Sequence, residues 1–119
     1  MKLLYVVLLS ISCSCYGISI QEFDQQYKNL DERLNNAIIN DLMYSRDYGD
    51  MKIPFSEKIE SKKSKCNLIE AEINISDFLI HNFAVYKEWI KQNQIDDDTG
   101  LDEFNSFHEN RKKIYRGCD

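Results

Sequence analysis

The sequence is poor in the residues that make tight turns: it has one proline, Pro54, and four glycines in 119 residues. A domain made of β-strands needs many such turns, so their scarcity argues against an all-β fold. Apolar residues recur instead at spacings of three and four, which places them on one face of a helix. We therefore expect an all-α fold, a small up-and-down bundle of three or four helices.

Charged side chains are scarce at the N-terminus, where Lys2 is the only one among the first 17 residues. An uncharged apolar run follows over residues 3–11, and small residues stand at Cys15 and Gly17. A short basic start, an apolar run and small residues at positions −3 and −1 are typical of a cleavable export signal, cut here before Ile18. The run is too short for a membrane span, which needs ~20 apolar residues.

These features divide the chain into an export signal at residues 1–17 and a single domain at residues 18–119 that is secreted or periplasmic. The alternative is a lipoprotein signal, with the lipid on Cys13 or Cys15. The residues before these two cysteines lack the leucine that is usual three positions upstream. Both versions place the domain outside the cytoplasm.

Removal of the signal leaves two of the four cysteines, Cys66 and Cys118. In an oxidising compartment we expect them to form one disulfide. Closing a loop of about fifty residues is worth roughly 4 kcal/mol in the chain-entropy model, and the bond would restrain a C-terminus that otherwise frays. The alternative is that each thiol stays free or pairs with another molecule.

The expected mature domain is acidic. The full chain has 15 basic and 20 acidic residues, and removal of Lys2 leaves 14 and 20, a net charge of −6. Binding to nucleic acid without sequence preference requires a basic surface, so we expect no nucleic-acid partner. The same balance argues against docking on an anionic membrane, and no second apolar run is long enough to span one. A basic protein is the partner that this charge favours, while the oligomeric state stays open.

The first two helices are expected on either side of Pro54. The first begins at the capping-box pattern of Ser19 and Glu22 and fades near residues 46–50. The second runs from about residue 54 to residue 93. Its expected break lies at residues 74–77, because Asn, Ser and Asp compete there for backbone hydrogen bonds.

The last helix is expected from about Leu101 to Arg116, with Thr99 as its N-cap. Cys66 on the second helix and Cys118 after the last one would then staple the bundle. The polar stretch at residues 57–65 is expected to face solvent.

Motifs that carry enzymatic chemistry are missing. The only histidines, His81 and His108, have no second ligand at metal-binding spacing, and no phosphate loop, dinucleotide fingerprint or nucleophile elbow is present. A calcium loop around Gly100 fails because the EF-hand register puts Ile95 and Ser106 at ligand positions. We therefore expect no metal, no cofactor and no enzymatic activity.

An acidic loop before the last helix is the main candidate for contact with a partner. Its carboxylates are Asp96, Asp97, Asp98, Asp102 and Glu103. They are interpreted either as a solvated helix start or as contacts for a basic protein.

Two further positions are candidate sites. Trp89, beside Lys87 and Lys91, has the aromatic and basic character of an interface centre, or else it covers the edge of the core. Asn74 begins the glycosylation sequon Asn-Ile-Ser, which matters only in a eukaryotic secretory pathway.

The segment from residue 30 to residue 43 resembles the Asp-x-x-Leu-Asn-x-x-Tyr region of LprI-type lysozyme inhibitors. The matching residues are Asp31, Leu34, Asn35, Ile38 and Leu42, with Ile38 where tyrosine is usual. The lysine-rich run from Lys58 to Cys66 resembles a second segment of that family in position, without its Gln, Trp and Arg-Asp, and the first-helix cysteine of many members is absent. The resemblance covers about a third of the chain. It implies a small exported helical inhibitor.

These features together lead us to expect an exported, non-catalytic domain that binds another protein, as an inhibitor or immunity protein against a hydrolase of the cell wall. The alternative is a secreted carrier or effector of a eukaryote that holds a small apolar ligand inside the bundle. An enzyme has the least support among the three classes.

Overall fold

The computed structural model describes residues 17–44 and 55–118. All regular structure in these ranges is helical, which confirms the expected all-α bundle. Its elements are α2 (Ile20–Tyr44), α3 (Phe55–His81), α4 (Phe83–Gln92), α5 (Leu101–Tyr115) and a 3₁₀ turn, η1 (Arg116–Cys118). The expected export signal, with Cys13 and Cys15, lies outside the described residues except for Gly17.

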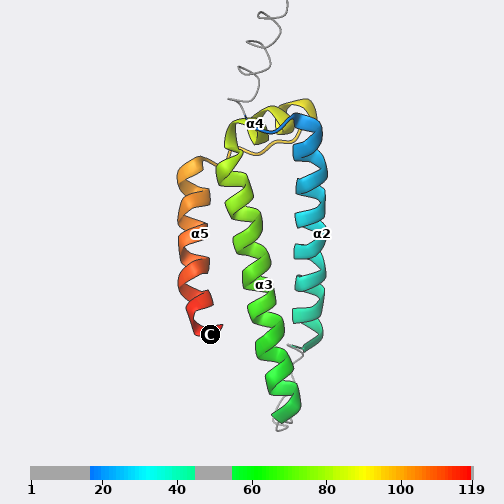
Figure 1. Cartoon of the computed structure of the whole chain (residues 1–119), viewed down its shortest axis with the longest axis vertical. Helices are drawn as coiled ribbons and strands as arrows, with labels where there is room; N and C mark the ends of the chain where they lie inside the picture. The colour runs from blue at the N-terminus through cyan, green and yellow to red at the C-terminus, as the bar shows by residue number, and fades with distance from the viewer. Residues whose placement is uncertain (1–16, 45–54, 119) are drawn as a thin grey trace, which may run out of the picture.

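The three long helices lie side by side, and α3 is the central one (Figure 1). It packs against α2 on one side and α5 on the other, and runs antiparallel to both. The short helix α4 lies across one end of the bundle, where it contacts α2 and α3. No helix in the described ranges is long and apolar enough to cross a membrane.

The start of α2 follows the capping pattern of its sequence. The hydroxyl of Ser19 accepts a hydrogen bond from the backbone N–H of Glu22 at 3.1 Å. The carbonyl of Ser19 accepts the first helical bond, from the N–H of Phe23 at 2.9 Å. The side chain of Ser19 thus satisfies one of the backbone donors that a helix start leaves open.

The break expected at residues 74–77 is wrong, because α3 continues through them to His81. The hydroxyl of Ser76 bonds to the carbonyl of Ile73 at 3.0 Å without leaving the helix. The interruption falls instead at Asn82, whose φ is −119° and whose side-chain amide donates to the carbonyl of Phe78 at 3.0 Å. Helix α4 begins directly after it, and the N–H of Tyr86 donates a hydrogen bond to the carbonyl of Asn82.

The hydrophobic core lies at the α4 end of the bundle and is largely aromatic. Phe23 is 0% exposed, and its ring centroid lies 5.0 Å from that of Phe78 on α3 and 5.7 Å from that of Trp89 on α4. Tyr27 stacks on Phe23, and its ring centroid lies 4.9 Å from that of Trp89 in a tilted arrangement. The other buried members of this cluster are Ile75, Leu79, Tyr86 and Ile90. One side chain of α2 therefore joins three helices.

The contact between α3 and α5 is a seam of polar and covalent links. From the α4 end downward, Ser76 meets His108 at 2.8 Å, and the guanidinium of Arg111 pairs with Glu72 at 2.8 Å. The seam ends in the expected disulfide between Cys66 and Cys118, whose Cα atoms are 5.8 Å apart. Residue numbers fall along α3 as they rise along α5, as an antiparallel pair requires.

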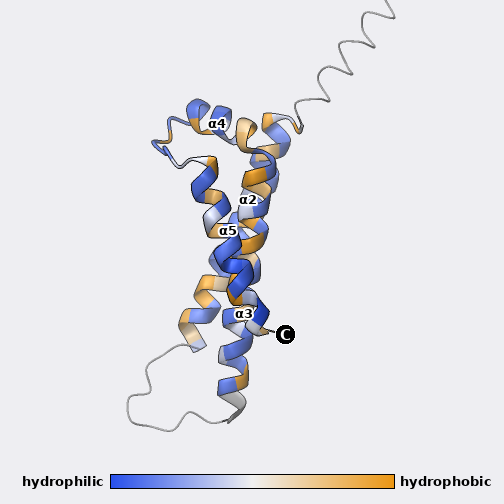
Figure 2. Cartoon of the chain, turned by 90° about the vertical axis from the view of Figure 1, so that its left-hand side faces the viewer, coloured by the Kyte–Doolittle hydropathy of each residue, from blue (hydrophilic) through white to orange (hydrophobic). Residues whose placement is uncertain are grey.

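The opposite end of α2 carries several hydrophobic residues (Figure 2), and their side chains are exposed. Its large apolar side chains there are between 38% and 66% exposed: Ile38, Ile39, Leu42, Met43 and Tyr44. Apolar burial is therefore concentrated at the α4 end.

Replacing Phe23 with alanine is expected to lower the free energy of unfolding by about 3–5 kcal/mol, the usual cost of removing a fully buried phenylalanine. Urea unfolding followed by circular dichroism measures this change. The control is Ile39→Ala on the same helix, where the side chain is 55% exposed and little change is expected. Equal losses in the two variants would contradict this location of the core.

Candidate functional site

The acidic loop leaves α4 through a tight turn. Gln94 has a φ of 56°, in the left-handed region, and the N–H of Ile95 reaches back to the carbonyl of Ile90 at 2.9 Å. Such a turn closes the open carbonyls at the end of a helix. The direction of the chain entering the loop is therefore defined by α4.

Asp97 points inward and braces the loop. Its Oδ1 accepts hydrogen bonds from the backbone N–H of Thr99 at 2.9 Å and from the Thr99 hydroxyl at 2.6 Å. Its Oδ2 accepts a hydrogen bond from the hydroxyl of Tyr86, which belongs to the core. The ammonium of Lys87 donates to the carbonyl of Thr99 at 2.8 Å. The loop is thus fastened to α4 by two side chains.

These contacts change the ionisation of both partners. The hydrogen bonds from Thr99 and from Tyr86 stabilise the carboxylate and hold the pKa of Asp97 below its ordinary value of 3.8. Burial, and then the bond to Asp97, raises the pKa of the Tyr86 hydroxyl above its ordinary value of 10.0. At neutral pH the pair is therefore a neutral phenol that donates to a charged carboxylate.

Thr99 was expected to cap α5, and that prediction is wrong. The N-cap of α5 is Gly100, which has an extended backbone and offers no side-chain bond. The Thr99 hydroxyl is used by Asp97 instead. An aspartate followed two residues later by threonine is a known local turn pattern, so the sequence did contain a signal for this bond.

The remaining acidic side chains of this region point into solvent. Asp96 and Asp98 are exposed in the loop, and Asp102 and Glu103 are exposed in the first turn of α5. None of the four forms an ion pair or side-chain hydrogen bond with a described residue. We call this set of four the acidic face.

Trp89 lies in the core and not on the acidic face. It is 9% exposed, and its indole N–H donates to Oδ1 of Asp24 at 2.9 Å. Lys28 pairs with the other oxygen of Asp24 at 2.9 Å. The bond from Trp89, followed by that from Lys28, lowers the pKa of Asp24. Of the two interpretations of Trp89, its position agrees with packing against the core.

The sequon at Asn74 lies in a different part of the bundle. Asn74 is exposed on α3, whereas Ser76 is 2% exposed and bonds to His108. Ser76 therefore has a packing role that is independent of any glycan. The other histidine, His81, is exposed at the end of α3, where its Nδ1 lies 2.8 Å from the carbonyl of Asp77.

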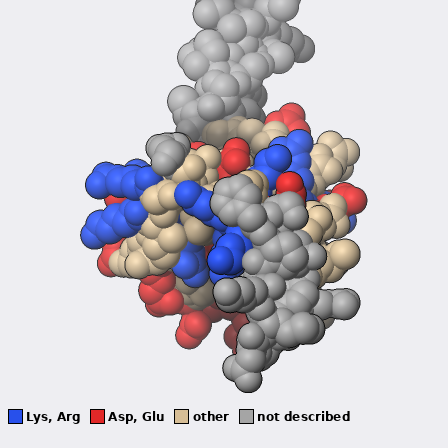
Figure 3. Space-filling view, turned by 90° about the horizontal axis from the view of Figure 1, so that it is seen from below, with Lys and Arg blue, Asp and Glu red and all other residues tan. Residues whose placement is uncertain are grey.

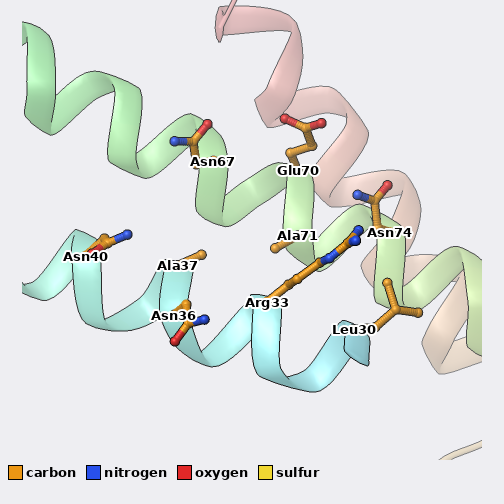
Figure 4. A pocket seen from close by; sticks show the side chains of 9 residues that line it. All are labelled: Leu30, Arg33, Asn36, Ala37, Asn40, Asn67, Glu70, Ala71 and Asn74. Carbon is orange, nitrogen blue, oxygen red and sulfur yellow. The ribbon is translucent and has the colours of Figure 1, made fainter. Parts of the chain in front are cut away.

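Asn74 also lines a polar groove of about 330 Å³ between α2 and α3 (Figure 4). Arg33 extends from α2 across this groove toward Asn74 (Figure 4). Further amide side chains come from both helices: Asn36, Asn40 and Asn67. This groove is uncharged apart from Arg33 and Glu70, which separates it in chemistry from the acidic face.

An apolar groove of about 450 Å³ lies at the start of α2 against α4. Its apolar lining comes from Ile18 and Ile20 on one side and from Ala84 and Val85 on the other. It lies beside the aromatic core and not inside it.

In the part of the chain that the structure describes, no group of three or more His, Cys, Asp or Glu side chains is placed to hold a metal ion. Comparison of the chain with protein-family models, with curated proteins and with solved structures finds no match. Function therefore has to be inferred from the chain's own residues.

Asp97→Asn is expected to lower the free energy of unfolding by about 1 kcal/mol at neutral pH, because the amide cannot accept all three hydrogen bonds. The pKa of Asp97 is lower in the folded state, so its stabilising effect is present above an ordinary pKa of 3.8 and is lost as the pH falls through the folded value. The difference between wild type and variant should therefore shrink between neutral pH and about pH 2. Urea unfolding at several pH values measures it.

Asp98→Asn is the matched control, because it removes the same charge from a neighbour that makes no such bonds. Its effect on stability should be small at every pH. If Asp97→Asn lowers the free energy of unfolding by the same amount down to acid pH, the hydrogen bonds of the Asp97 carboxylate do not stabilise the loop as described.

Proposed function

We propose that residues 18–119 form an exported, non-catalytic domain that binds and inhibits a basic extracytoplasmic hydrolase, as an inhibitor or immunity protein. A lysozyme is the leading target, because lysozymes are typically cationic. The observation that carries the proposal is the acidic face: Asp96 and Asp98 on a fastened loop and Asp102 and Glu103 in the first turn of α5 are exposed, and none pairs with a described residue.

The hydrogen bonds of Asp97 matter for binding because a flexible loop loses conformational entropy when it binds a partner. A loop held by Asp97 and Tyr86 has fewer conformations to lose when a partner docks, so more of the contact energy appears as affinity. The unpaired carboxylates around it would raise the rate of encounter with a cationic surface and orient the two molecules.

Two further features support this proposal. The disulfide between Cys66 and Cys118 is a bond that persists in oxidising, extracytoplasmic compartments. The segment that resembles LprI-type inhibitors lies on α2, where Asp31 and Asn35 are joined by a side-chain hydrogen bond of 3.4 Å. Ile38 and Leu42 of this segment are 38% and 66% exposed, so they are available to a partner as well.

The alternative, a carrier of a small apolar ligand, has less support. The aromatic core occupies the interior at the α4 end, with Phe23 0% exposed. The apolar groove beside it lies at the surface between the start of α2 and α4, and it is the feature that a carrier would have to use.

The proposal predicts that the purified protein inhibits hydrolysis of bacterial cell walls by a cationic lysozyme. The double variant Asp96→Lys with Asp98→Lys should slow association with the enzyme by roughly tenfold, because like charges replace opposite ones at the contact. Lysozyme turbidity assays measure inhibition, and surface plasmon resonance at low and high salt separates the association and dissociation rates.

Glu32→Lys with Glu60→Lys is the matched control. It makes the same change in net charge at exposed positions on α2 and α3, outside the acidic face. If both double variants reduce inhibition equally, net charge and not the acidic face is responsible. Absence of inhibition across a panel of cell-wall hydrolases would refute the proposed function.

A further inference from the structure

A third groove, at the disulfide end of the bundle, is basic, in contrast to the acidic face. Its volume is about 410 Å³, and it lies between the first half of α3 and the C-terminal turn η1. Lys58, Lys62 and Lys65 line it from α3. Ile114, Gly117 and Cys118 line it from the other side. We call it the lysine groove.

The three lysines share one face of α3. Their spacing of four and three residues places them on neighbouring turns, over about 10 Å of helix. None of them forms an ion pair with a described residue, whereas Lys28, Lys112 and Arg111 elsewhere in the bundle do. No described acidic side chain lines the groove.

Like charges at this spacing repel each other, and a concave wall of low dielectric constant concentrates their field. The groove therefore attracts anions although the whole chain has a net charge of −5. Viewed from this end, Lys and Arg side chains gather on the left and in the centre of the described surface (Figure 3). The net negative charge of the sequence argued against anionic partners, but the local charge at this groove is positive.

We propose that the lysine groove binds a linear polyanion, a glycan chain that carries sulfate, phosphate or carboxylate groups. Three ammonium groups spread along a helix match acidic groups repeated along a chain. A flat bilayer does not enter a concave groove, and none of the exposed apolar side chains at the end of α2 lines it.

An extended acidic peptide is a poorer match for the same groove. Peptides in extended form are usually held by backbone hydrogen bonds along a sheet edge. Both walls here are helical, so the groove has no sheet edge on which an extended peptide could form a ladder of backbone hydrogen bonds, and its lysines offer charged side-chain donors. A ligand with many acidic oxygens and few backbone donors is therefore favoured.

The disulfide holds one wall of this groove in place. Cys118 belongs to the wall and is bonded to Cys66 on α3, so the position of η1 depends on the oxidised bond. Binding of the polyanion should consequently weaken when the disulfide is reduced. This dependence would not be expected of a diffuse attraction to exposed lysines.

The test titrates the oxidised protein into a fluorescent heparin-derived octasaccharide and follows fluorescence anisotropy. Saturable binding is expected, with a Kd that rises between about 50 and 200 mM salt because neutralised charges release counterions. Lys62→Gln with Lys65→Gln should raise the Kd roughly tenfold, since two of the three ammonium groups are lost. Lys62 and Lys65 are both exposed, so the double variant should keep the circular dichroism spectrum of the helical wild type.

The matched control is Lys63→Gln with Lys91→Gln, which removes two exposed lysines that do not line the groove. Its Kd should stay close to that of wild type. Absence of octasaccharide binding, or an equal loss in the two double variants, overturns the proposal.

Two further probes separate the sources of negative charge. Vesicles of phosphatidylcholine with about 30% phosphatidylglycerol should bind less tightly than the octasaccharide, because a bilayer does not enter the groove. Octaglutamate should also bind less tightly. Tighter binding of either probe, lost in Lys62→Gln with Lys65→Gln, would assign the groove to a lipid surface or to an acidic peptide instead. These assays use no hydrolase, so their outcome is independent of the proposed inhibition.

Discussion

The side chain of Phe23 reaches from the first turn of α2 into α3 and α4, and its burial holds three helices together at one end of the bundle. Neighbouring contacts build on that position. Asp24, the next residue, accepts the indole bond of Trp89, and Tyr86 in the same cluster donates to Asp97. The loop that carries Asp96 and Asp98 is therefore positioned by the aromatic core, through the hydrogen bond from Tyr86 to Asp97.

Helix α5 is attached in a different way. None of its residues is fully buried, although Phe104 in its first turn packs against the core, with its ring centroid 5.6 Å from that of Tyr86 and 6.0 Å from that of Phe83. Its links to α3 are a serine–histidine bond, an ion pair and a disulfide. Polar pairs with partial exposure contribute little each, whereas closing a loop of this length is worth roughly 4 kcal/mol in the chain-entropy model. The covalent bond is consequently the strongest of these links to α3, and it restrains the C-terminal end of α5 and the wall of the lysine groove.

Charge is distributed unevenly over this protein. An acidic chain carries a lysine groove at one end and an acidic face near the other. Because surface charges are screened within about 10 Å at moderate salt, each region acts on its own surroundings. Under the two proposals, a domain of this kind would hold an anionic glycan at the disulfide end while its opposite end meets a basic enzyme.

Local patterns in the sequence were sufficient for several features of the fold. Helical spacing of apolar residues, the scarcity of turn residues and the cap at Ser19 all report on neighbours within a few positions, and the structure agrees with them. The pairing of Cys66 with Cys118 followed from elimination, once two of four cysteines were assigned to the signal. The position of the break was not predictable in this way, because residues 74–77 stay helical, with Ser76 bonded to Ile73 within α3 and to His108 on α5, and the interruption falls at Asn82.

The sequence by itself determined the helical class, the disulfide pair and the presence of an acidic loop. Only the tertiary structure decided which carboxylates of that loop are available. Asp97 turns inward because Tyr86 and Thr99 satisfy it, while Asp96 and Asp98 on either side stay in solvent. Likewise Trp89 is buried because its ring packs against Phe23 and Tyr27, and Asp24, 65 residues away, accepts its N–H. The lysines gain a facing wall from the C-terminal turn, which the disulfide joins to α3. Such pairings depend on how the helices meet in space, and residue spacing along one helix carries no information about them.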